Sequence, residues 1–156
     1  MSKYDKKIIQ QNSNQLKKSI PQVQQSYSSN KMKSVWMFDK IDVGGGDFAF
    51  DISRNKFEHK EFLSKMIDYS NKTWDEIKNE THDKHNKTKH HYIGDKLSPV
   101  AQKRLKALNL EEASDSIYSF AFNNMLRIIG IRENEKFHIL WYDLDHKVSP
   151  STLKHT

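Results

Sequence analysis

Three apolar stretches near the C-terminus decide the fold: IYSFAF at residues 117–122, LRIIGIR at residues 126–132 and FHILWYD at residues 137–143. Their β-branched and aromatic residues favour strands, and short polar segments rich in Asn and Glu, which are typical of turns, separate them. Consecutive strands joined by short turns pair antiparallel. The sequence therefore predicts a three-stranded antiparallel meander within residues 115–149, as the core of a small α+β domain.

The alternation of side chains within the last two stretches assigns residues to the faces of the predicted sheet. Arg127 and Arg132 are separated by an odd number of positions, so they are expected on opposite faces. In the third stretch, a regular strand would put Trp141 on the face of Phe137 and Tyr142 on the other face. Both faces carry apolar side chains, which indicates that the sheet is at least partly covered on both sides.

Two shorter apolar stretches, residues 35–39 and residues 48–52, lie on either side of the consecutive glycines at 44–46. Glycine readily adopts the positive φ that a hairpin connection needs. The sequence therefore predicts a β-hairpin ahead of the meander. The glycines are not a phosphate-binding loop, because no lysine follows them and they do not join a strand to a helix.

Helices are expected between this hairpin and the meander. Apolar side chains recur at helical spacing over residues 62–70. Thr73 and Glu76 have the spacing of a capping box, which predicts a second, short helix with Trp74 facing inward. Ser98 followed by proline predicts a third helix, whose apolar residues from Val100 onward would also face inward.

The net charge of +6 lies in the first part of the chain. Residues 1–33 hold seven lysines and one aspartate, whereas residues 34–156 hold nineteen basic and nineteen acidic residues. The first segment is rich in Gln, Ser and Asn, which is typical of an arm that orders only on a partner. We therefore predict a flexible basic arm over residues 1–33 and a single α+β domain over residues 34–156. The partner-binding lysines of the arm would be Lys6, Lys7, Lys17 and Lys18.

Composition disfavours several classes of protein. The chain has no cysteine, which excludes disulfides, thiol catalysis and thiolate zinc sites. No apolar run approaches the roughly 18 residues of a membrane span, and the charged N-terminus does not look like a secretory signal. We expect a cytoplasmic protein that binds no membrane and uses no cofactor.

The first candidate site is a basic segment from His82 to Lys106, which holds seven basic and two acidic residues. A basic loop that leads into a basic helix face can contact phosphates. The expected nucleic-acid-binding residues are Lys84, Lys87, Lys89, Lys103, Arg104 and Lys106. The alternative is a solvated loop followed by the lysine-rich outer face of a helix.

Histidines in the same segment could ligate a metal ion. They are His82, His85, His90 and His91. A zinc site needs three or four ligands on a rigid frame, and this segment offers neither a thiolate nor a helical i, i+4 pair of histidines. We therefore expect no metal site.

The second candidate site follows the last predicted strand. Asp143, Asp145 and His146 bring carboxylates and an imidazole to one edge of the sheet. A carboxylate that orients a histidine is part of general acid–base machinery. The expected catalytic residues are therefore His146, Arg127 and Arg132. The alternative is that the two aspartates form the turn that ends the strand and that His146 caps it.

From Val35 to Thr156 the chain resembles a family of small bacterial proteins with VWMFD, TWDEI and the C-terminal motif RIIGIR…ILWYDxDHKVxPSxxKHT, although this resemblance implies no particular chemistry. Helices followed by an antiparallel meander also resemble the RelE/YoeB/ParE toxin superfamily. Its nuclease members cut ribosome-bound mRNA with basic, His and Tyr side chains on the strands and at the C-terminal end. That resemblance implies such roles for Arg127, Arg132 and His146, although the superfamily's excess of positive charge is missing from residues 34–156.

Three functions are compatible with these observations. The first is a RelE-like protein that binds or cleaves RNA, such as an endoribonuclease toxin with an antitoxin partner. The second is a non-catalytic phage or mobile-element protein that binds and inhibits a host nucleic-acid enzyme, for example a Cas nuclease. The third is an antitoxin-like accessory protein whose arm folds on a larger protein.

Overall fold

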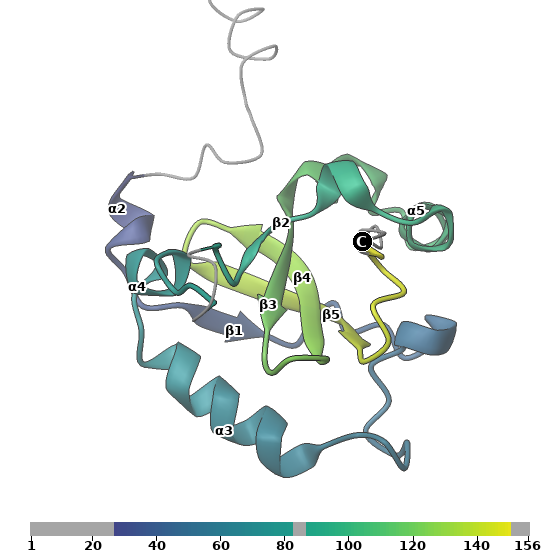
Figure 1. The fold of residues 1–156 in the computed structure, drawn as a ribbon. Coiled ribbons are helices and arrows are strands. Elements are labelled where there is room, and N and C mark those ends of the chain that lie inside the picture. Colours follow the sequence, from purple (N-terminus) through teal and green to yellow (C-terminus); the bar gives the residue numbers. More distant parts are fainter. Residues whose placement is uncertain (1–26, 83–86, 151–156) are drawn as a thin grey trace, which may run out of the picture.

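The computed structural model describes residues 27–82 and 87–150, so most of the predicted arm lies outside the described residues (Figure 1). The fold is α+β, as predicted, with a five-stranded sheet in the order β1-β5-β4-β3-β2. The strands are β1 (Val35–Met37), β2 (His91–Tyr92), β3 (Ile117–Ala121), β4 (Arg127–Glu133) and β5 (Lys136–Asp143). The last three form the predicted antiparallel meander. At the edges, β1 pairs parallel with β5 and β2 pairs antiparallel with β3.

Two helices begin where the sequence predicts, after Thr73 and after Ser98, and a third covers the predicted residues 62–70; a further short helix lies in the segment predicted as the arm. They are α2 (Tyr27–Asn30), α3 (His59–Ser70), α4 (Trp74–Lys78) and α5 (Pro99–Ala107), with short 3-10 helices η1 (Gly46–Phe48), η2 (Gly94–Lys96) and η3 (Glu111–Ser116). The capping box of α4 is complete: the Thr73 hydroxyl accepts from the Glu76 amide at 3.2 Å, and the Glu76 carboxylate accepts from the Thr73 amide at 2.8 Å. Ser98 caps α5 by accepting from the Ala101 amide at 3.3 Å.

Two apolar cores lie on the two faces of the sheet. On the α3 face, residues of α3 and α4 such as Tyr69 and Trp74 pack against β3, β4 and β5 in a cluster rich in aromatic rings. On the α5 face, residues of α5 and β5 such as Leu105 and Leu140 form the second core. Figure 1 shows α3 and α5 on different sides of the sheet, and this two-sided cover confirms the interpretation of the apolar pattern.

The predicted N-terminal hairpin is wrong. Residues 48–52 form no strand, and β1 pairs with β5 instead. The segment crosses the edge of the sheet and buries Phe48 in the core of the α5 face and Phe50 in the core of the α3 face. Burial of these two rings on opposite faces is incompatible with a flat hairpin strand. Gly46 does adopt a positive φ, 67°, but it does so at the start of η1.

Because of a bulge between β4 and β5, residues near the end of β5 lie on other faces of the sheet than predicted. The ladder shifts register at Ile129/Gly130, so Leu140 and Trp141 both lie in the core of the α5 face while Tyr142 lies in the other core. A Cβ at position 130 would overlap the carbonyl oxygen of His138, which explains the glycine at this close approach. Upstream of the bulge the alternation holds.

The helices bury fewer of their apolar residues than predicted. In α3, Phe62 and Tyr69 face the core, whereas Leu63 and Ile67 are exposed. In α5, Val100 is likewise exposed. The apolar stripe of each helix is wider than the sheet surface that covers it. Within the described residues, no helix has the length and apolar character required to span a membrane.

Candidate functional site

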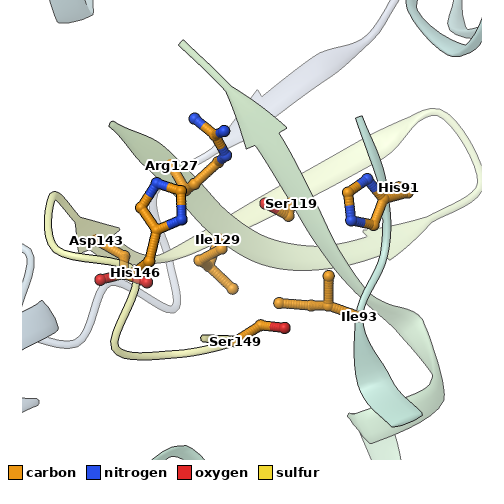
Figure 2. A pocket seen from close by; sticks show the side chains of 8 residues that line it. All are labelled: His91, Ile93, Ser119, Arg127, Ile129, Asp143, His146 and Ser149. Atoms are coloured by element: carbon orange, nitrogen blue, oxygen red, sulfur yellow. The ribbon is translucent and has the colours of Figure 1, made fainter. Parts of the chain in front are cut away.

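A pocket of about 270 Å³ opens on the α5 face, where β3 and β5 end and β4 begins (Figure 2). It is lined by His91, Ile93, Ser119, Arg127, Ile129, Asp143, His146 and Ser149. Figure 2 shows His146 and Arg127 on one side of the pocket and His91 on the other, with Ser119 between them. Of the three predicted catalytic residues, the pocket unites His146 and Arg127.

The register of the strands brings these side chains together. Ser119 of β3 lies between His91 of β2 and Ile129 of β4 in the ladder, so the three share the α5 face. Arg127 lies two positions before Ile129 and therefore projects from the same face. Asp143 is its partner on β5. The pocket wall thus comes from four strands and from the loop after β5.

Arg127 is the positively charged group of the pocket. Its Nη1 donates to the carbonyl oxygens of Asn123 at 2.7 Å and of Leu126 at 3.1 Å. These two bonds fix one nitrogen of the guanidinium against the β3–β4 turn. Burial lowers the pKa of Arg127, and the charge of Asp143 opposes that effect. A guanidinium remains protonated in proteins despite such shifts. The pocket therefore holds a permanent positive charge that is incompletely hydrated.

His146 is held in an unusual backbone conformation. Its φ of 56° lies in the left-handed region, which is rare for a residue with a side chain. Asp143 stabilises this turn, because its two carboxylate oxygens accept from the amides of Lys147 and Val148, both at 2.9 Å. Nε2 of His146 is buried and has no hydrogen-bond partner within the described residues. Asp143 therefore acts on His146 through the backbone, as in the alternative in which it forms the turn.

His91 was expected only as one of several histidines in a basic loop, yet it forms the wall opposite His146. The residue as a whole is exposed, but its ring is partly desolvated against the pocket, and this loss of hydration lowers the pKa of His91. The positive charges of Lys96 and Arg127 lower it further. The ring of His91 is therefore neutral at neutral pH and can accept a proton.

Arg132, the third predicted catalytic residue, is not at the pocket. Its side chain lies on the α3 face, as the alternation predicted, with its guanidinium 4.0 Å from the ring centroid of Trp74. Nε donates to the carbonyl oxygen of Asn134 at 2.9 Å, and Nη2 donates to Oδ1 of Asn30 at 2.5 Å. An arginine on the opposite face of the sheet cannot act on the same atoms as His146.

Among the predicted phosphate-contacting residues, Arg104 has a structural partner. Its guanidinium donates to both carboxylate oxygens of Asp42, at 2.8 and 2.7 Å. Asp42 is buried and also accepts from the Trp141 indole at 2.8 Å and from the Gly44 amide at 3.0 Å. Burial alone would raise the pKa of Asp42, but the bonds from Arg104 and Trp141 outweigh it and keep that pKa below its usual value. Nothing in the sequence signalled this pairing across 62 residues.

The lysines predicted to contact phosphates or a partner differ in their exposure and in whether the structure describes them. Lys87, Lys103 and Lys106 are exposed, and Lys89 is half-buried next to His90. The other predicted binding lysines lie outside the described residues: Lys84 in the basic segment, and Lys6, Lys7, Lys17 and Lys18 in the arm. Lys87 and Lys89 directly precede β2, so they approach the edge strand that carries His91.

His90 has a structural role. It is buried, its Nε2 lies 2.8 Å from Oε2 of Glu80, and its Nδ1 accepts from the Ala121 amide at 3.0 Å. Burial lowers the pKa of His90 to about 4. Of the other histidines weighed as metal ligands, His85 lies outside the described residues. Within residues 27–82 and 87–150, no group of three or more His, Asp or Glu residues has the geometry to hold a metal ion.

Comparison of the chain with known protein families, curated proteins and solved structures finds no match. A functional hypothesis must therefore come from the site itself. Two imidazoles on opposite sides of one pocket can serve as a general base and a general acid. A guanidinium beside them can stabilise negative charge that develops on a phosphoryl group. Such a set of groups suits the transfer or cleavage of a phosphate ester.

Proposed function

We propose that the protein binds RNA and cleaves its phosphodiester bonds at this pocket, as a RelE-like endoribonuclease. The observation that carries the proposal is the presence of His91, His146 and Arg127 in the wall of one pocket. The lysines before β2 and Lys96 after it supply the positive charge that an RNA backbone requires. A toxin of this kind would act on RNA in the cell and would be controlled by an antitoxin.

The proposed reaction begins at the ribose 2′-hydroxyl. Neutral His91 removes the 2′-hydroxyl proton as the oxygen attacks the adjacent phosphorus, and a new P–O2′ bond forms. The P–O5′ bond breaks, and protonated His146 gives its proton to the leaving 5′-oxygen. Arg127 stabilises the negative charge on the non-bridging phosphoryl oxygens as the bonds exchange. The products are a 2′,3′-cyclic phosphate and a 5′-hydroxyl, and the two histidines end in exchanged protonation states.

His146→Asn is the sharpest test of this reaction. Asparagine tolerates the left-handed backbone conformation of position 146 and lacks an imidazole. We expect cleavage of end-labelled RNA to fall by roughly 10²- to 10⁴-fold, the usual contribution of a general acid or base. The exposed His59→Asn on α3 is the matched control and should cleave like the wild type. Growth arrest on expression should follow the same pattern.

Two results would contradict the proposal. One is a purified wild-type protein that cleaves none of a panel of structured and unstructured RNAs. The other is an Asn variant at position 146 that cleaves as fast as the wild type with unchanged products. The product ends are also diagnostic, because a 3′-hydroxyl with a 5′-phosphate would require attack by water and another assignment of roles.

A second candidate function, binding and inhibition of a host nucleic-acid enzyme, is favoured by a different observation. An apolar hollow of about 520 Å³ lies beside α3. Its lining includes the exposed side chains of Phe38, Val43, Ile52 and Leu63. Exposed apolar hollows of this kind are typical of protein contacts. Stable capture of a nuclease by the protein, lost on Leu63→Glu and retained on His146→Asn, would favour this function over RNA cleavage.

A further inference from the structure

We propose a second phosphate-binding subsite on the α3 face, across the edge strand β2 from the pocket. It would hold a phosphate of the same RNA strand whose scissile phosphate lies in the pocket, so the inference rests on the proposed function. The subsite is a hollow of about 310 Å³, here called the edge hollow. It is lined by Lys78, Thr88, His90, His91, Tyr92, Tyr118 and Arg132.

The edge hollow and the pocket meet at one residue. His91 lines both, and its neighbour Tyr92 belongs to the edge hollow alone. Because β2 is only two residues long and is the last strand of the sheet, little separates the two faces at this edge. A flexible single strand that passes over β2 can reach both cavities, and bases can stack on the ring of Tyr92 as it passes.

The edge hollow carries positive charge both at its base and at its rim. At its base lies Arg132, which is 2 % exposed and stacks on Trp74, so its guanidinium is fixed in place. At its rim lies exposed Lys78. Two acidic groups act electrostatically on this hollow, Glu80 on Tyr118 and Asp75 on Arg132, and each pairs with another cation: Glu80 with Lys72 at 2.6 Å, and Asp75 with Lys31 at 2.8 Å. This arrangement favours an anionic ligand.

The hydroxyl of Tyr118 adds a donor at the same place. Tyr118 is 2 % exposed, and its Oη is buried with no hydrogen-bond partner within residues 27–82 and 87–150. Burial raises the pKa of Tyr118, so the hydroxyl keeps its proton. A buried hydroxyl without a partner is uncommon in folded proteins. A phosphate oxygen that enters the hollow would accept from it and complete its hydrogen bonding.

Substrate length separates the edge hollow from the pocket. A dinucleotide fills the pocket alone, whereas a longer oligonucleotide also reaches the edge hollow. We expect Tyr118→Phe and Lys78→Ala to raise KM several-fold for a ten-nucleotide RNA and to leave kcat/KM for a dinucleotide unchanged. Lys78→Ala should also reduce the slope of log K against log salt by about 0.7 for the longer strand, the value for one phosphate contact on a single strand. Equal effects on both substrates, or no effect on either, would overturn the proposal.

A binding experiment without catalysis distinguishes failure of this inference from failure of the proposed function. The probes are a ten-nucleotide oligodeoxynucleotide, which lacks the attacking 2′-hydroxyl, and inorganic phosphate, each titrated into isotope-labelled protein. If the wild type cleaves no RNA but the oligodeoxynucleotide shifts Thr88 and Tyr118 amides and Tyr118→Phe abolishes those shifts, the edge hollow stands and the cleavage proposal fails. If only inorganic phosphate produces the shifts, the hollow binds a free anion and the strand path is wrong. Tyr142→Phe, a buried tyrosine elsewhere in the same core, is the control for packing changes.

Discussion

Arg127 and Asp143 lie opposite each other in the ladder of β4 and β5, and each directs its charged group to the backbone of a different loop. The guanidinium donates to the carbonyl oxygen of Asn123 in the β3–β4 turn. The carboxylate accepts from the amides of Lys147 and Val148 beyond β5. One cross-strand pair thus fixes both loops that border the pocket.

The first prediction concerns the carboxylate of Asp143. In Asp143→Asn, an amide nitrogen replaces one carboxylate oxygen and cannot accept a hydrogen bond, so one of the two loop amides loses its partner. We expect the free energy of unfolding to fall by about 1–3 kcal/mol, the usual cost of a buried group left unsatisfied. Urea denaturation measures this change. Exposed Asp145→Asn is the matched control and should change stability by less than about 0.5 kcal/mol. Equal stability of the two variants would show that the carboxylate does not hold the loop.

The second prediction concerns the pH dependence of cleavage. Because desolvation and nearby cations lower the pKa of His91 below 6.5, the base stays neutral into mildly acidic solution. The acid limb of kcat/KM, which reports the free enzyme, should therefore have its midpoint below pH 6.5. Cleavage rates between pH 4.5 and 8 on a dinucleotide measure it. Lys96→Gln removes one of the responsible charges and should move the midpoint upward. An unmoved midpoint would exclude His91 as the base.

The third prediction concerns stability in acid. The folded protein keeps His90 neutral, with a pKa of about 4, whereas the unfolded chain takes up a proton near pH 6.5. The unfolded state therefore binds more protons between these values, and stability must fall as the pH is lowered from 6.5 towards 4. At about 1.4 kcal/mol for each pH unit, the loss is on the order of 2–3 kcal/mol. His90→Asn keeps an acceptor near the Ala121 amide and should lower stability overall but flatten this dependence. A dependence as steep as that of the wild type would assign the effect to other groups.

The fourth prediction separates structural from RNA-contacting positions on α5. Arg104→Gln leaves the buried Asp42 without its cation, and removal of one partner from such a pair costs about 3–5 kcal/mol when both are buried. Arg104 is partly exposed, so we expect the lower end of that range, about 3 kcal/mol. Lys103→Gln on the same helix should be neutral for stability. If instead both variants are stable and both weaken RNA binding equally, Arg104 contacts RNA rather than organising the loop around Asp42.

The sequence predicted those parts of the fold that depend on neighbouring residues. The meander, the capping box at Thr73 and the helix start at Ser98 each use residues within a few positions of one another, so their patterns are complete in a short window. The opposite faces of Arg127 and Arg132 follow from the same local alternation. His146 and Arg127 were predicted together because both lie next to turns of the meander.

What the sequence did not reveal depends on distant residues. β1 pairs with β5 across about a hundred positions, so its hydrogen-bonding partner is β5 and not residues 48–52, as the predicted hairpin required. No local pattern in the sequence distinguishes Asp42 from the other aspartates, because its partners Arg104 and Trp141 are brought to it only by the fold. His91 enters the pocket only because β2 pairs with β3, which places it beside Ser119. A strand of two residues carries too little pattern to be detected in a polar loop.

The bulge at Gly130 makes the length of β5 a constraint on the pocket. The extra residue sets the side on which every later side chain of the strand emerges. If β5 ran through Leu140 as a regular strand without the bulge, Trp141 would turn away from Asp42, Tyr142 would leave the aromatic core, and Asp143 would point away from the loop of His146. Deletion of Leu140 would remove the bulge and keep these three side chains on their present faces, because Trp141 would then follow Ile139 directly, whereas an inserted residue would shift them to the other face. This part of β5 should therefore tolerate the loss of Leu140 better than the insertion of a residue beside it.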